Sequence, residues 1–331
     1  MDTDKEKIFW FGATTAIILA MIWLADVEKF LEKLTAADPV YLIPAFLAGT
    51  AVLPIFGYIW YSFFKHMKMN VSYFKSLKMF LAGDFLNGIT PLGQFGGEPL
   101  MAYIIQKNTD ISYEKSLSTV ISADIINALP VFTFTIGGAI YLILFQSINQ
   151  LFLKTMYIAL IIAIFGGALV YLMWFKAGKI ENTLFKIFER ITTLIGHGEH
   201  LLERIEKSLN KVQQAFQTIG ESPKHLAKVA IVAHLTFILH IIGLYFVLKS
   251  LGVTTNLTPL YFVAVVSAFG EFSPTPGGEG TTEAIMSGAL TLFVGVSMST
   301  AVAAAIIYRL TTHWQNLTYG YISINTLRNG K

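Results

Sequence analysis

Two short segments carry the residues that could do chemistry in an otherwise apolar chain. The first, residues 88–99, reads GITPLGQFGGEP, and the second, residues 273–283, reads SPTPGGEGTTE. Proline removes a backbone donor and glycine frees the backbone, so we expect each segment to unwind a helix. Unwound backbone survives at membrane depth only where protein buries it or where it lines a water-filled cavity. Paired breaks of this kind indicate a transport site, and we call them the first and second breaks.

The residues around the breaks favour an anion, and in particular a phosphate. Arg309, in the last apolar segment, carries a permanent charge and a planar fork of donors that suits phosphate. We expect Pro99 at the first position of one helix, and Thr281 or Thr282 as the cap of a helix that begins after Gly280. Two helix N-termini would then direct free amides and partial positive charge at one anion.

Acidic residues within or beside the apolar segments complicate this anion site. They are Asp84, Glu98, Asp124, Glu271, Glu279 and Glu283. An ionised side chain inside a membrane is costly, so each needs a partner, a proton or a cation. In one account Arg309 bridges Glu98 and Glu283 as a latch while backbone amides hold the substrate. In the others, carboxylates bind the protons or sodium ions that drive transport, or bind the amine of an aminoacylated lipid.

The candidate substrate-binding or coupling residues lie in the breaks and in the spans beside them. They are Pro91, Gly96, Gly97, Glu98, Asp124, Glu271, Pro276, Gly277, Gly278, Glu279, Thr281, Glu283, Arg309 and His313. His313 is included because it lies one helical turn after Arg309 on the same face. The alternative for Glu98, Glu283 and Arg309 is a buried ion pair that only fixes helix packing. We predict no catalytic residue.

The composition indicates an integral membrane protein. The 331 residues are 54% hydrophobic and 14% charged, with a mean hydropathy of +0.59, a balance foreign to soluble domains. The small net charge of +3 argues against a nucleic-acid partner, and zero cysteines exclude disulfides and thiolate sites. The run from His197 to His200, with Glu199 between them, superficially resembles a metal site, but Gly198 and the missing third ligand favour a solvated helix end. We expect no metal and no cofactor apart from a coupling ion, H⁺ or Na⁺.

The expected fold is a single all-α transmembrane domain over residues 1–331. About 20 helical residues cross the hydrocarbon core, which gives six spans, at 8–25, 40–64, 117–145, 154–176, 227–249 and 299–326. The regions 74–107 and 258–295 are each cut by a break into halves too short to cross, so we expect two re-entrant hairpins. The polar segment 177–226 has apolar residues every three or four positions, which predicts amphipathic helices on the cytoplasmic surface.

The distribution of Lys and Arg predicts the orientation. With both termini in the cytoplasm, only Lys29, Lys33, Lys154 and Lys249 of the 24 basic residues lie outside, and Arg309 lies within a span. The first hairpin then enters from the cytoplasm and the second from the opposite side. The two breaks should meet near the midplane as an inverted pair. We expect this bundle in the cell membrane, that is, the plasma or inner membrane.

The chain resembles a known family at these residues. Gly97-Glu98, the run Pro274 to Gly280 with Glu283, and Arg309 resemble the lysylphosphatidylglycerol synthase transmembrane region, also called the flippase-like membrane family. The resemblance spans essentially the whole chain. It implies movement of lipids or lipid-linked intermediates between leaflets, in some members fused to an aminoacyl-transferase or glycosyltransferase domain.

Two departures from the family pattern matter. Gln94 stands where many members carry a basic residue, which weakens a phosphate contact from the first break. The chain runs to Lys331 without a soluble catalytic domain, so aminoacylation of phosphatidylglycerol is not expected of this polypeptide.

The expected function is that of a lipid flippase or transporter. Its substrate would be a phosphate-bearing lipid: a polyprenyl phosphate, a lipid-linked intermediate, or an anionic or aminoacylated phospholipid. No nucleotide-binding loop is present, so transport would run downhill or on an ion gradient. The alternatives are a scaffold for a membrane glycosyltransferase or aminoacyl-transferase partner, and an enzyme that modifies a lipid phosphate with Asp84 and Asp124.

Overall fold

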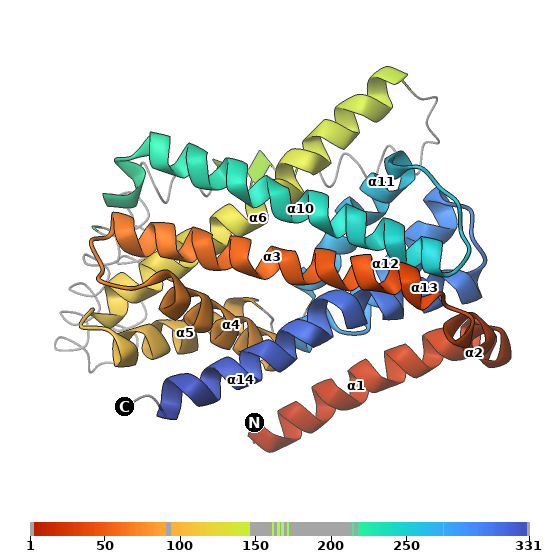
Figure 1. The fold of residues 1–331 in the computed structure, drawn as a ribbon, viewed down its shortest axis with the longest axis horizontal. Helices are drawn as coiled ribbons and strands as arrows, with labels where there is room; N and C mark the ends of the chain where they lie inside the picture. The colour runs from red at the N-terminus through yellow and green to blue at the C-terminus, as the bar shows by residue number, and fades with distance from the viewer. Residues whose placement is uncertain are drawn as a thin grey trace, which may run out of the picture. The chain divides into compact units, whose positions relative to one another are not determined.

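Helices make up the described structure. The computed structural model describes residues 3–90, 94–145, 218–273 and 275–329, with scattered positions between 161 and 214. Every element in these ranges is helical and none is a strand, which confirms the predicted all-α membrane fold (Figure 1). Within the same ranges, the helices long and apolar enough to cross a membrane are Pro39–His66, Tyr113–Tyr141 and Pro223–Ser250.

The chain divides into two compact units. Unit 1 comprises Met1–Tyr58, Tyr73–Met101 and Val232–Lys331, and unit 2 comprises Ile59–Ser72 and Ala102–Ile231. Unit 1 therefore holds both breaks and the last span. Unit 2 holds α6 (Tyr113–Phe145). The predicted span 154–176 and most of the predicted amphipathic segment 177–226, with His197, Glu199 and His200, lie outside the described residues.

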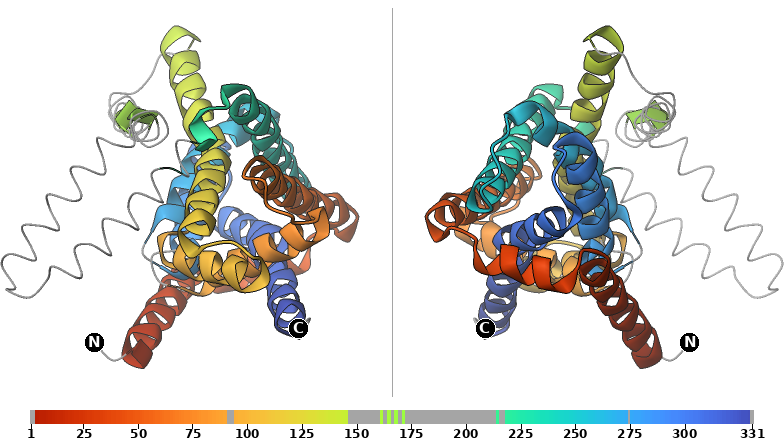
Figure 2. Two further views of the ribbon diagram at one scale, coloured as in Figure 1. Left: turned by 90° about the vertical axis from the view of Figure 1, so that its left-hand side faces the viewer. Right: turned by 90° about the vertical axis from the view of Figure 1, so that its right-hand side faces the viewer.

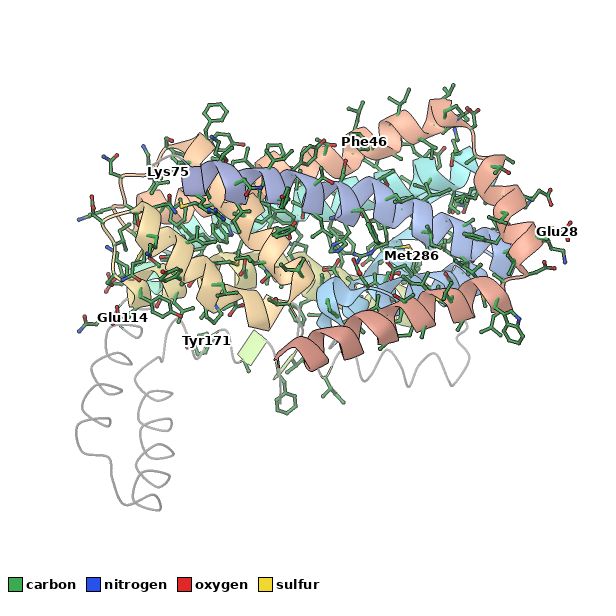
Figure 3. The ribbon with its side chains drawn as sticks, turned by 90° about the horizontal axis from the view of Figure 1, so that it is seen from below. Glu28, Phe46, Lys75, Glu114, Tyr171 and Met286 are labelled. Atoms are coloured by element: carbon green, nitrogen blue, oxygen red, sulfur yellow. The ribbon has the colours of Figure 1, made fainter. Side chains whose placement is uncertain are left out.

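The chain begins with three helices, α1 (Thr3–Leu24), α2 (Val27–Thr35) and α3 (Pro39–His66), and α3 continues past Tyr58 into unit 2. The short α2 is amphipathic, and its Phe30 is buried against Val302 and Ala303 of the last span. The apolar outer face of α3 is exposed, as expected for a lipid-facing helix: Figure 3 shows Phe46 projecting outward, with 41% of its surface accessible, and Met286 of α12 turned inward.

The first break separates two antiparallel helices, α4 (Tyr73–Ile89) and α5 (Gln94–Asn108). Gly97 packs against the Asn87 side chain, and Gly83 packs against Met101. Later positions in α5 thus contact earlier positions in α4, so residues 83–101 of unit 1 form the tip of a helical hairpin and not one interrupted span. Pro99 lies inside α5, and its expected position at the helix start is wrong, because the helix resumes at Gln94.

The second break also lies at the tip of a helical hairpin. Its arms are α11 (Leu257–Ala268) and α12 (Thr281–Phe293), joined through the short helices η1 (Phe269–Phe272) and η2 (Pro276–Gly278). The rings of Phe262 and Phe293 stack at 5.6 Å, and Gly270 packs against Thr282, which makes the arms antiparallel. The tip needs glycine because φ is +58° at Gly277, +69° at Gly278 and +79° at Gly280.

The last predicted span is one helical run with an irregular turn in its middle. It consists of α13 (Met298–Arg309), the π-helical turn η3 (Leu310–Trp314) and α14 (Gln315–Asn329). Buried alanines in α13 allow close helix packing. The π turn begins directly after Arg309, and such turns often mark functional positions in helices.

Glycine allows α14 to lie directly on α4. Gly320 faces the Leu81 carbonyl and the Phe85 side chain, at 2.5 and 2.6 Å from the place a Cβ atom would take. Within the described residues of unit 1, α4 and α14 make an extensive contact. α1 contacts α12 and α13 instead, and Figure 2 shows it as a helix separate from α14.

This close approach predicts the effect of adding one methyl group. Gly320→Ala should lower the free energy of unfolding by about 1 to 3 kcal/mol, because backbone and Cβ atoms of α4 have to shift. Gly288→Ala is the matched control, since Gly288 lies in α12 with nothing within 4 Å of the added atom. Thermal unfolding in detergent measures both. Equal melting temperatures for the two variants would contradict the α4–α14 packing.

Candidate functional site

A buried ion pair lies at the centre of the candidate site. Arg309 and Glu283 are 4% and 3% exposed, and Arg309 Nε donates to Glu283 Oε1 at 2.9 Å. Arg309 Nη2 also donates to the Gly277 carbonyl at 2.8 Å. The end of α13 is thereby joined to the start of α12 and to the tip of the second break. Charge-assisted hydrogen bonds of this kind are the strong ones in proteins.

Glu283 also caps α12. Its Oε2 accepts a hydrogen bond from the Gly280 backbone N–H at 2.7 Å, so one carboxylate serves both the helix start and Arg309. The predicted caps, Thr281 and Thr282, are wrong, because Gly280 is the N-cap and the carboxylate three residues later reaches its amide. The Thr281 hydroxyl instead lies 3.4 Å from that of Thr275.

His313 lies where the two breaks meet. A Cβ atom on Gly277 would fall 2.8 Å from the His313 ring and 3.1 Å from the Gly88 carbonyl oxygen. The first break at Gly88, the second at Gly277 and the π turn of the last span therefore contact one another, as expected for paired hairpins. His313 Nε2 is 3.5 Å from Glu279 Oε1, and both side chains are largely buried.

Carboxylates outnumber cations around this contact. Asp84 on α4 is half-buried, and Glu271 in η1 is exposed. Their charges interact with each other and with Arg309. Glu283 is paired with Arg309 and Glu279 lies near His313, so within the described part of unit 1 four carboxyl groups interact with one arginine or one histidine. In these same residues no three His, Cys, Asp or Glu side chains are grouped so as to hold a metal ion.

The remaining predicted residues lie apart from the ion pair or outside the description. Glu98 is half-buried in α5, and within the described residues it makes no hydrogen bond or ion pair with Arg309. Of the two expected partners of Arg309, only Glu283 therefore pairs with it there. Gly96 lies in the first turn of α5, and Gly97 is buried against Asn87. Pro276 and Gly278 are buried in η2. Pro91 lies outside the described residues, and Asp124 belongs to unit 2, half-buried in α6.

Sequence reasoning missed several contributors. Gly88 was part of the first break but not a predicted site residue, although its carbonyl lies beside Gly277. Thr275 was missed as well: its hydroxyl is 2.7 Å from that of Ser273 and links it to Thr281. The hydroxyl residues that alternate with prolines in the second break were the available signal.

Comparison with known proteins places the chain in a family. The family described as lysylphosphatidylglycerol synthase TM region matches residues 11–320. A UPF0104 membrane protein of Pyrococcus horikoshii is 26% identical over 99% of this chain and 98% of its own length. UPF0104 membrane proteins of Methanothermobacter thermautotrophicus and Methanocaldococcus jannaschii are 25% and 24% identical, each over 93% of this chain and at least 90% of their own lengths.

The contact between the breaks predicts the effect of a methyl group on Gly277. Gly277→Ala should destabilise the protein for two reasons. Alanine is strained at the positive φ of this position, and its Cβ atom would clash with the His313 ring. Gly252→Ala controls for the backbone term, because Gly252 has φ +73° and nothing within 4 Å. We expect a loss about 1 to 3 kcal/mol larger for Gly277→Ala in thermal or denaturant unfolding. An equal loss would show that the breaks do not meet at this residue.

The buried pair predicts strong coupling in a double-mutant cycle. Glu283→Gln or Arg309→Gln alone should cost about 3 to 5 kcal/mol, because each leaves a buried charge unpaired. The double variant should cost clearly less than the sum of the two. The exposed pair of Asp26 and Lys29, also 2.9 Å apart, is the control and should show much weaker coupling. Additive losses at Arg309 and Glu283 would contradict the pair.

Proposed function

Because this chain belongs to the family of lysylphosphatidylglycerol synthase transmembrane regions, we propose that it moves a phosphate-bearing lipid between membrane leaflets. The substrate class is a polyprenyl phosphate or lipid-linked intermediate, or an anionic or aminoacylated phospholipid. These lipids share the phosphate that the site would recognise. Transport runs downhill or on an ion gradient, and the chain acts as a transporter, not as an enzyme.

The meeting of the two breaks at His313 carries this proposal. Non-helical backbone within a membrane protein is stable only where it is buried or lines a hydrated path. Here the tips of two antiparallel hairpins touch through Gly88 and Gly277. In transporters, discontinuous helices of this kind form the substrate site, and the movement of one repeat against the other alternates access to it.

Arg309 is the residue best suited to the phosphate. Guanidinium has five N–H donors, and in the described residues Glu283 takes the one on Nε while the Gly277 carbonyl takes one on Nη2. The Nη1 donors remain for a lipid phosphate. Because Glu283 neutralises the charge of Arg309 at rest, an approaching phosphate is held by hydrogen bonds more than by net charge. Release into the other leaflet then costs less than from an unpaired arginine.

The arrangement of the chain ends supports the proposed orientation. We propose that the protein lies in the cell membrane with both termini in the cytoplasm, as the Lys and Arg distribution predicts. In Figure 1, α1 and α14 run in opposite directions, so the N-terminus of α1 and the C-terminus of α14 lie on the same side of unit 1. Both helices belong to unit 1.

Leaflet exchange in sealed proteoliposomes tests the function. A fluorescent polyprenyl phosphate and a fluorescent anionic glycerophospholipid are compared in the native protein, in Glu283→Gln, in Arg309→Gln and in the control Gly288→Ala. We expect exchange of one lipid class, reduced about tenfold or more by each pair variant and unchanged in the control.

Two results would contradict the proposal. Exchange of neither lipid by the folded native protein would favour a scaffold for a membrane glycosyltransferase or aminoacyl-transferase partner. Undiminished exchange in a folded Glu283→Gln or Arg309→Gln variant would move the site away from the breaks.

A further inference from the structure

His313 and Glu279 form a second acid–base pair, next to the ion pair of Arg309 and Glu283. Their Nε2 and Oε1 atoms are 3.5 Å apart, which is longer than a strong hydrogen bond. In the described parts of the chain, His313 Nε2 is buried and makes no hydrogen bond. A neutral imidazole at this distance gains little from the carboxylate, whereas a protonated one gains an ion pair. The geometry therefore discriminates between the two protonation states of His313.

The position of His313 connects its charge to the contact between the hairpins. Its ring packs against Gly277 in the second break and lies near Gly88 in the first. The π turn that carries it follows Arg309 directly. A charge that appears or disappears on this ring acts where, in the described residues, Gly88, Gly277 and the last span meet.

Three charged groups act on His313, and two more act on its neighbour Arg309. Arg309 on α13 opposes a second positive charge, while Glu279 after η2 and Glu283 on α12 favour it. Asp84 on α4 and Glu271 in η1 act on Arg309 and on each other. Glu283 is already bound to Arg309 and to the Gly280 amide. Of the carboxylates near the imidazole, Glu279 is thus the one left to share a proton with it.

We infer that the His313–Glu279 pair is a proton-binding site that couples lipid movement to a proton gradient. The inference rests on the proposed function and names its driving ion. One proton binds Nε2 from one side of the membrane, the imidazolium pairs with Glu279, and the contact between the breaks tightens. When the hairpins rearrange, the proton leaves Nε2 to the opposite side. No covalent bond to carbon or phosphorus forms or breaks, and the proton is the only species gained and lost.

Gradient-driven lipid distribution tests the coupling. Proteoliposomes with the native chain receive the transported lipid and an imposed difference of about one pH unit, a sodium gradient, or no gradient. With one proton per lipid, we expect an asymmetry of up to about tenfold across the bilayer under the pH difference alone. His313→Gln and Glu279→Gln should abolish the asymmetry. Trp314→Phe, an exposed neighbour in the same π turn, should keep it.

The outcomes separate this inference from the proposed function. Exchange that proceeds but ignores the pH difference, or that follows sodium, overturns the proton site and leaves the transporter in place. An asymmetry that persists in folded His313→Gln also overturns the proton site. Exchange of no lipid under any condition overturns the function and the coupling together.

A spectroscopic titration decides the matter if His313→Gln fails to fold or transport is slow. The imidazole resonances of His313 are followed against pH by nuclear magnetic resonance in the native protein and in Glu279→Gln. Loss of the carboxylate should displace the pH at which the resonance changes by about one unit. An unchanged titration would show that Glu279 and His313 do not share a proton, and would overturn the inference.

Discussion

The buried pair of Arg309 and Glu283 is the interaction on which the rest of the site depends. A membrane protein cannot keep an arginine 4% exposed without a partner, since an uncompensated charge there is costly. Glu283 supplies the opposite charge and at the same time caps α12 through the Gly280 amide. The second bond of Arg309, to the Gly277 carbonyl, fixes a tip whose glycines have positive φ. Pairing, capping and tip geometry are therefore one connected arrangement.

This arrangement places a polar, acid-rich contact between two helical hairpins. With the second tip held by Arg309, Gly277 lies against Gly88 of the first break, and the His313 ring fits between them. Neither glycine position has room for a side chain, which explains glycine at both. Because carboxyl groups outnumber cationic side chains here, the net charge of the site does not by itself attract an anion. In the proposed transport, a lipid phosphate would bind the Nη1 donors of Arg309 while Glu283 keeps its bond to Nε.

Local patterns predicted the elements better than their contacts. Proline and glycine in the two breaks were enough to predict two hairpins, and hydropathy was enough for the spans at α3, α6 and α10 (Pro223–Ser250). The partner of Arg309 was not predictable, because Glu98 and Glu283 are equivalent in sequence terms and only tertiary packing chooses between them. The Thr281 and Thr282 caps were misplaced because the Glu283 carboxylate reaches the Gly280 amide. Pro99 was misplaced because α5 already begins at Gln94. The π turn after Arg309 has no recognisable signal in the sequence.

The central claim is that a lipid headgroup passes the contact between the two breaks, and photo-cross-linking tests it most directly. A phospholipid and a polyprenyl phosphate, each with a photoreactive group at the phosphate end, are irradiated with the reconstituted protein and the adducts are mapped by mass spectrometry. The account predicts adducts at residues 88–98 and 273–283 that unlabelled lipid displaces. Adducts confined to exposed apolar faces, such as that of Phe46 on α3, would contradict it.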